Sequence, residues 1–117
     1  MDSLYRFYLD EETGEITKTV INTYHTVHPS KYLPQKVHYV YRNENGISHD
    51  VHGENIDRFV NWQVYSFSDD EEKARDIMLA NLRMRYKKAI LDTKRFATVI
   101  DKLGGFSDEE DGDILSI

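Results

Sequence analysis

The chain has 117 residues and no cysteine, and its 21 acidic and 15 basic residues give a formal net charge of −6. This length favours a single domain, and the lack of cysteine excludes disulfides, thiolate zinc sites, iron–sulfur clusters and cysteine nucleophiles. No apolar run reaches the roughly 20 residues of a membrane helix, and the N-terminal residues lack the basic start and apolar block of a signal peptide. We therefore expect a soluble cytoplasmic protein with no membrane partner.

The first predicted element is a β-hairpin. Residues 4–9 are expected to form a strand with Tyr5, Phe7 and Leu9 on one face and Leu4, Arg6 and Tyr8 on the other. Residues 16–24 are rich in the β-branched side chains that suit a pleated strand. Between them, Gly14 can adopt the left-handed conformation that a tight turn with a bulge requires. Residues 25–36 hold both prolines of the chain and are expected to form an irregular connection.

A second hairpin is predicted around Asn45-Gly46, because both residues tolerate the positive φ of a type I′ turn. A two-residue loop there pairs Val40 with Val51. One face of the hairpin then carries His38, Val40, Arg42, Ile47, His49 and Val51, and the other carries Val37, Tyr39, Tyr41, Asp50 and His52. A slip of one residue would exchange these faces. After a turn or helical stub over residues 53–59, residues 60–67 alternate as a fifth strand.

The second half of the chain predicts one long helix over residues 68–103, which Gly104-Gly105 ends. Ser68 and Glu71 form a capping box, in which the hydroxyl of Ser68 accepts from the amide of Glu71. The fold class is therefore α+β: an antiparallel sheet of about five strands, made of two hairpins and one strand, packed by the C-terminal helix. We expect a single domain over residues 1–105, β-rich over 1–67, followed by an acidic, mobile tail over 106–117.

Two apolar columns run along the predicted helix. The longer column has spacings of three and four and is expected to pack on the sheet; its members are Leu79, Leu82, Tyr86, Ala89, Thr93, Phe96, Ile100 and Leu103. The shorter column, Ile77, Met84 and Leu91, lies on the opposite side. It is either a surface for a partner or a second copy, or a set of scattered surface residues. Tyrosines on an open sheet face, Tyr39 and Tyr41 among them, would add to a partner surface.

Charge is segregated along the chain. Candidate acidic partner-binding residues lie in the first turn and at the start of the helix: Asp10, Glu11, Glu12, Asp69, Asp70, Glu71 and Glu72. A basic helix face follows, made of Arg83, Arg85, Lys87, Lys88, Lys94 and Arg95. This face is either a solvated surface, a contact for phosphates of a nucleic acid, or a contact for an acidic protein.

The sequence gives little support for catalysis or metal binding. His25 and His28 are three residues apart, as are His49 and His52, and residues three apart on a strand point to opposite faces. No serine lies in a glycine-flanked elbow, and the carboxylates stand in exposed runs that do not tune their acidity. We therefore expect no enzyme activity, no catalytic residues, no metal and no cofactor.

In its shortness, acidity and lack of cysteine, the whole chain resembles the small accessory proteins of bacteriophages, including inhibitors of the anti-CRISPR kind. The resemblance implies a non-enzymatic protein of the host cell cytoplasm that binds a host protein or nucleoprotein complex and inhibits it. The acidic runs would then compete for a basic groove that normally holds phosphate. The alternatives are a binder of nucleic acid or an anionic ligand through the basic helix face, and a structural subunit that self-assembles, for example as a homodimer, through the helix.

Overall fold

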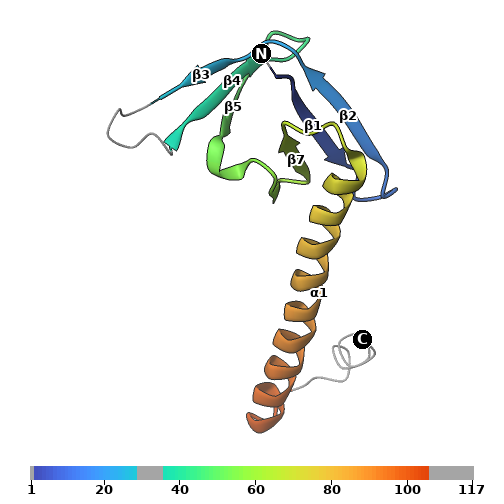
Figure 1. The fold of residues 1–117 in the computed structure, drawn as a ribbon. Helices are drawn as coiled ribbons and strands as arrows, with labels where there is room; N and C mark the ends of the chain where they lie inside the picture. The colour runs from blue at the N-terminus through green and yellow to red at the C-terminus, as the bar shows by residue number, and fades with distance from the viewer. Residues whose placement is uncertain (1, 29–35, 106–117) are drawn as a thin grey trace. The chain divides into compact units, whose positions relative to one another are not determined.

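The computed structural model describes residues 2–28 and 36–105, and it has two antiparallel sheets and one long helix (Figure 1). The predicted α+β fold class is confirmed. The chain divides into two compact units, residues 1–80 and residues 81–117. The expected tail over 106–117 lies outside the described residues, as do residues 29–35 of the expected irregular connection.

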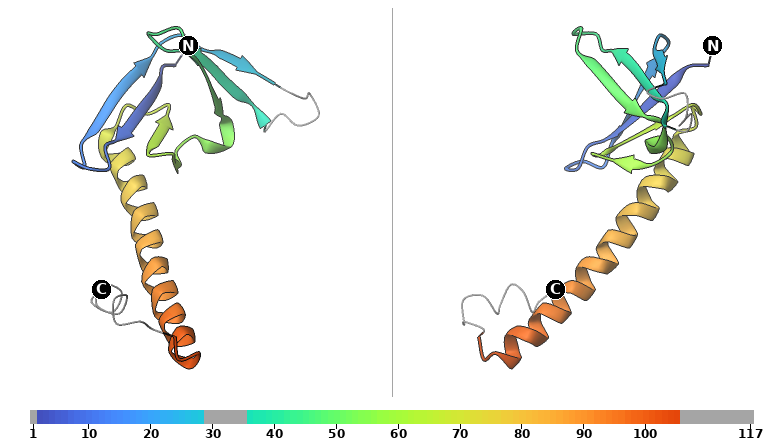
Figure 2. Two further views of the ribbon diagram at one scale, coloured as in Figure 1. Left: turned by 180° about the vertical axis from the view of Figure 1, so that it is seen from behind. Right: turned by 90° about the vertical axis from the view of Figure 1, so that its left-hand side faces the viewer.

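In the described part of the chain, seven strands form two sheets, where the sequence predicted one sheet of about five. The four-stranded sheet has the order β2-β1-β7-β6, with β1 Leu4–Leu9, β2 Ile16–Ile21, β6 Phe59–Val60 and β7 Gln63–Ser66. The three-stranded sheet has the order β3-β4-β5, with β3 His25–Val27, β4 His38–Arg42 and β5 Ser48–His52. A 3-10 turn, η2 Gly53–Asn55, follows β5, and the helix α1 spans Glu71–Lys102 (Figure 2).

The first predicted hairpin is confirmed. Strands β1 and β2 pair antiparallel from Leu4 opposite Ile21 to Leu9 opposite Ile16. Gly14 has a φ of 75° in the turn, and its N–H donates to the carbonyl of Asp10 at 2.8 Å. This positive φ is the reason that glycine suits the position.

Two other strand predictions were wrong. The strand predicted over residues 16–24 ends at Ile21, and residues 25–27 form β3, inside the segment that was expected to be irregular. Residues 60–67 are not one strand, because Asn61 and Trp62 have φ values of 53° and 64° and turn the chain between β6 and β7. A tryptophan rarely adopts a left-handed φ, so the sequence offered no turn signal here.

One hydrophobic core lies between the two sheets. Its buried members come from β1, β2 and β7 of one sheet, from β4 and β5 of the other, and from the segment after β2: Leu4, Ile21, Tyr24, Tyr41, Val51 and Tyr65. The side chains of Tyr39 and Ile56 pack against this cluster. Residues 1–80 therefore form a two-layered β structure around an aromatic-rich core.

The other face of the four-stranded sheet is also covered. Phe7 on β1 and Val64 on β7 are fully buried and lie opposite each other in the register, on the face away from Leu4. Ala74 and Met78, one helical turn apart near the start of α1, are each 2% exposed. The first turns of α1 thus pack on the sheet, in agreement with the predicted helix-on-sheet arrangement.

The N-cap of α1 is Asp70, not Ser68 as predicted. The Asp70 carboxylate accepts from the amides of Glu72 and Lys73 at 3.0 and 3.4 Å, and the Asp70 carbonyl accepts from the amide of Ala74. The Ser68 hydroxyl accepts only from the amide of Asp70, at 3.2 Å, so the capping box does not form. Asp70 is favoured because a carboxylate caps as well as a hydroxyl and also suits the positive end of the helix dipole.

Residues 81–105 differ from the rest of the described chain, because none of their side chains is buried. Tyr86 and Phe96, from the column expected to pack on the sheet, are 66% and 54% exposed. The buried positions of α1 are Ala74 and Met78, which precede that column. These two members of the column are therefore open to solvent rather than buried.

Candidate functional site

Three of the seven predicted acidic partner-binding residues have local structural roles. The carboxylate of Asp10 accepts from the amides of Glu12 and Thr13, and these hydrogen bonds hold the pKa of Asp10 below its ordinary value. Asp70 caps α1, and Glu71 accepts from Arg75 one turn later at 3.2 Å. These groups are committed to the turn and the helix start.

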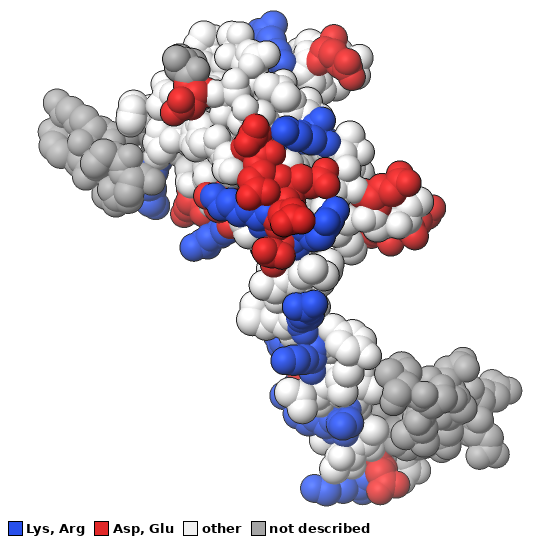
Figure 3. All heavy atoms as spheres, turned by 45° about the vertical axis from the view of Figure 1, so that its right-hand side comes forward, with Lys and Arg blue, Asp and Glu red and all other residues white. Residues whose placement is uncertain are grey.

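The other four, Glu11, Glu12, Asp69 and Glu72, are exposed and form no ion pair with any described residue. Figure 3 shows acidic side chains gathered on one face of the β-rich unit, with a few lysines and arginines among them. The amine of Lys73 pairs with the carboxylate of Asp57 at 3.4 Å. The acidity that remains available to a partner is therefore smaller than the sequence indicates.

The basic residues of α1 lie on two sides of the helix. Positions 83, 87 and 94 share one side, and positions 88 and 95 share another, since residues four or seven apart on a helix lie on one face. All six predicted basic residues are exposed: Arg83, Arg85, Lys87, Lys88, Lys94 and Arg95. Only Arg95 forms an ion pair within the described part of the chain, with Asp92 at 3.2 Å.

Exposed apolar side chains lie between these basic rows. Met84 and Leu91 of the shorter predicted column are 65% and 66% exposed, whereas Ile77 is partly buried. On the opposite side of α1, Tyr86 and Phe96 of the longer column are also open to solvent. Residues 81–103, the C-terminal part of α1 and the residue after it, are thus basic and expose apolar side chains on two sides.

The two tyrosines expected on an open sheet face lie in or against the core instead. Tyr41 is buried, and its hydroxyl forms a 2.6 Å hydrogen bond with the hydroxyl of Tyr65. Burial and this bond raise the pKa of Tyr41 above its ordinary value of 10.0. Tyr39 makes edge-on ring contacts with Tyr24 and Phe67. Both residues therefore serve packing between the sheets.

The β4–β5 hairpin has a different register from the predicted one. Tyr39 pairs with Val51 and Val40 with Asp50, one residue away from the expected pairing. The cause is Asn43, whose side-chain oxygen accepts from the amides of Asn45 and Ile47 and closes a three-residue loop. Gly46, with a φ of 77°, occupies the last position of this loop.

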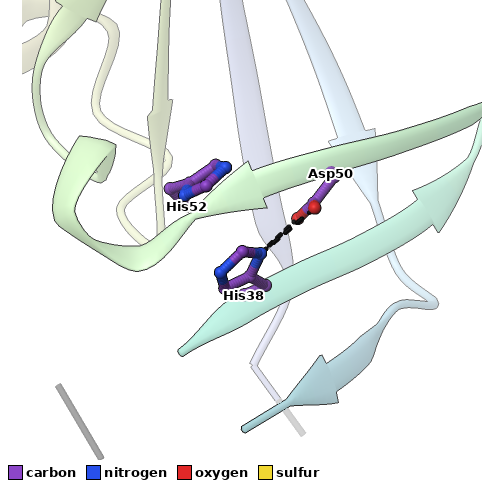
Figure 4. A group of neighbouring side chains, drawn as sticks. All are labelled: His38, Asp50 and His52. Atoms are coloured by element: carbon purple, nitrogen blue, oxygen red, sulfur yellow. Dashed lines mark hydrogen bonds and ion pairs between the residues drawn. The ribbon is translucent and has the colours of Figure 1, made fainter. Parts of the chain in front are cut away.

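The corrected register brings three chemical groups together. His38 lies directly opposite His52, and Asp50 stands two residues before His52 on the same face of the sheet (Figure 4). Both carboxylate oxygens of Asp50 lie 3.1 Å from Nδ1 of His38. The rings of His38 and His52 have centroids 4.2 Å apart. We call His38, Asp50 and His52 the histidine cluster.

The sequence did not predict the histidine cluster, because the two-residue loop expected at Asn45-Gly46 places His38 on the opposite face from Asp50 and His52. The three residues come together across two strands, so their grouping can be predicted only if the length of the loop between the strands is known. The two pairs considered earlier do not converge. His49 lies on the other face of β5, stacks on Tyr41 and lies 3.2 Å from the Asn43 side-chain nitrogen.

Comparisons of this chain with protein-family models, with curated proteins and with solved structures find no match. Among the described residues, no helix combines the length and the apolar character that crossing a bilayer requires.

Proposed function

We propose that this protein is a non-enzymatic binding protein that inhibits or modulates a partner protein by occupying its surface. The main contact in this proposal is residues 81–103, which are the C-terminal part of α1 and the residue after it. The observation that carries this proposal is the exposure of large apolar side chains on a helix that buries none of its residues after position 80. Tyr86, Leu91 and Phe96 are each more than half exposed.

Helix energetics support this proposal. Isolated helices are marginal in water, and most helices in proteins are stabilised by packing an apolar face. After Asn81 the described contacts of α1 are local, such as the Arg95–Asp92 pair and the bonds from the hydroxyls of Thr93 and Thr98 to carbonyls one turn earlier. Each local pair contributes only a few tenths of a kcal/mol. A partner that accepts the apolar face would supply the missing packing.

The apolar and basic side chains of the helix indicate which properties a complementary partner surface should have. An amphipathic helix docks in an apolar groove through side chains spaced three and four residues apart. Here Tyr86 and Phe96 belong to such a column, and the basic residue Arg85 stands beside it, three residues after Leu82 and four before Ala89. The partner proposed is therefore a protein with an apolar groove bordered by carboxylates.

The test uses two matched variants of the tagged full chain. Tyr86→Gln with Phe96→Gln removes the longer column, and Met84→Gln with Leu91→Gln removes the shorter column, while glutamine preserves helix propensity. Each bait is incubated, with and without nuclease, in a lysate of cells that naturally contain the protein. We expect a stoichiometric protein that survives nuclease, is lost with the first variant and is retained by the second.

Other outcomes would contradict the proposal. Loss of all captured proteins after nuclease would indicate a nucleic-acid ligand of the basic helix face. A mass that doubles with concentration, and that the same variants reduce, would indicate that the apolar groove belongs to a second copy. Equal capture by all baits would show that α1 is not the contact.

The narrower proposal is that the partner belongs to a host nucleic-acid-handling complex of the kind that anti-CRISPR proteins inhibit. It is supported by the exposed carboxylates of Glu11, Glu12 and Glu72, which form no ion pair within the described part of the chain and could occupy a basic surface that normally holds phosphates. Charge reversal of Glu11 and Glu12 should slow association and reduce its salt dependence. Asp70→Asn leaves the helix cap intact and is the matched control. A rate that neither salt nor reversal changes would contradict this partner class.

A further inference from the structure

The outer face of the three-stranded sheet carries an unusual number of histidines. In the register of β3, β4 and β5, one row contains Val27, His38 and His52. The next row contains His25, Val40 and Asp50. This face is opposite to the one that carries the buried Tyr41 and Val51, so its side chains are not needed for the core.

The histidine cluster has the spacing of a metal site. One ligand atom from each of His38, Asp50 and His52 lies within 4.8 Å of the ligand atoms of the other two. Two ligands of a tetrahedral zinc ion stand roughly 3.3 Å apart, given metal–nitrogen and metal–oxygen distances near 2.0–2.2 Å. The 3.1 Å between His38 and Asp50 is close to this spacing, and a ring nitrogen of His52 lies within 4.8 Å of the ligand atoms of both.

The backbone holds this end of the hairpin in place. Gly53, directly after His52, donates its N–H to the carbonyl of Val37 at 2.8 Å. A Cβ atom at Gly53 would lie 2.7 Å from Cγ1 of Val37, so the two strands approach as closely as glycine allows. The close approach fixes His52 opposite His38, and a fixed backbone lowers the cost of arranging the ligands.

We infer that His38, Asp50 and His52 form a binding site for a divalent transition-metal ion, with Zn²⁺ as the ion to be tested. Two imidazoles and one carboxylate suit zinc and its neighbours in the first transition row, whereas Mg²⁺ and Ca²⁺ prefer oxygen ligands alone. Three protein ligands leave at least one position for water or for a group of another molecule. The inference is independent of the proposed function, which concerns residues 81–103.

The ion pair between His38 and Asp50 does not by itself account for the arrangement. The pair is solvent-accessible, with side-chain exposures of 23% and 51%, and exposed ion pairs contribute little to stability. Among the described residues, it also leaves the His52 ring, which lies beside the His38 ring, without a carboxylate partner. A cation bound by all three groups would satisfy both rings and the carboxylate together.

Calorimetric titration of the metal-free full chain with Zn²⁺ tests the inference, with Mg²⁺ as the control ion. The variants His52→Gln and Asp50→Asn remove one ligand each. His25→Gln is the matched control, because His25 lies on the same sheet face but across Val40 from Asp50. The four substituted positions are all at least partly exposed: His25, His38, Asp50 and His52. Each variant should therefore unfold at the same temperature as the wild type when both are measured in the presence of a chelator.

We expect one Zn²⁺ per chain and no heat with Mg²⁺. Each ligand variant should raise the dissociation constant at least about tenfold, since even residues that only orient a ligand change affinity by 10–100-fold. His25→Gln should leave the constant unchanged within about twofold. A second readout is the visible absorption of bound Co²⁺, which His38→Gln should abolish. Absence of zinc binding, or equal weakening by His25→Gln and His52→Gln, would overturn the inference.

Discussion

Tyrosine occupies opposite environments in the two units of this chain. Tyr41 and Tyr65, in residues 1–80, are buried and joined by a hydrogen bond between their hydroxyls, whereas Tyr86, in residues 81–105, is 66% exposed. The difference comes from the neighbours that each segment has, since two sheets close over the first pair and no described element covers the third. Composition alone therefore does not decide which aromatic residues form a core and which are available to a partner.

The largest expected effect on stability comes from replacing a buried phenylalanine in residues 1–80, and comparing it with an exposed phenylalanine in residues 81–105 tests the difference in burial. Phe7→Ala should lower the free energy of unfolding by about 3–5 kcal/mol, because it leaves a cavity at a side chain that is fully buried. The matched change Phe96→Ala should cost less than about 0.5 kcal/mol, as expected for an exposed position. Urea denaturation of both variants measures the difference. Equal losses would show that residues 81–105 are buried to the same degree as the sheet.

The next effect concerns the buried tyrosine pair. Tyr41→Phe should cost about 1–3 kcal/mol, because it leaves the hydroxyl of Tyr65 buried without its partner. Replacing both tyrosines by phenylalanine should cost less than the sum of the single changes. Urea denaturation of the three variants gives the coupling energy. Additive losses would contradict the 2.6 Å hydrogen bond.

The same pair predicts a dependence of stability on pH. The pKa of Tyr41 is raised in the folded state above the ordinary value of 10.0, so the unfolded chain loses this proton at lower pH than the folded chain does. The contribution of the protonated Tyr41 hydroxyl to the free energy of unfolding is fully present below about pH 10 and is lost as the pH rises further. Denaturation between pH 8 and 11 should show falling stability, with a shallower fall for Tyr41→Phe. A fall of equal slope in both proteins would assign the titration to other groups.

A smaller effect is expected at the helix cap. Asp70→Ala should destabilise the protein by about 1 kcal/mol, because two helix amides lose their acceptor. Ser68→Ala should cost less, since the Ser68 hydroxyl accepts from only one amide, before the helix begins. Thermal or urea unfolding distinguishes the two. A larger loss for Ser68→Ala would restore the capping box that the sequence predicted.

These positions also show what the sequence could predict. The first hairpin was predicted correctly because Gly14 and a run of β-branched residues both indicate it. The helix start was predicted to within a few residues, but Ser68, Asp69 and Asp70 are all good caps. Local preference cannot choose among them, and the choice is made by where the helix must begin to bury Ala74.

The candidate metal site could not be predicted, for a different reason. The Asn45-Gly46 pair favours a two-residue loop, but the side chain of Asn43 binds two loop amides and makes the loop one residue longer. A change of one residue moves every side chain of the second strand to the other face. The grouping of His38 with Asp50 and His52 thus depends on one amide side chain outside the cluster.

Hydrogen exchange of the isolated full chain, resolved by residue, tests the central contrast between the two units most directly. The account predicts that amides of β1 and β7 exchange only through global unfolding, whereas amides from Arg83 to Ile100 exchange much faster through local opening. Protection of the helix amides equal to that of β1 would contradict it. That result would show that the apolar side chains of residues 81–103 are already packed in the protein without a partner.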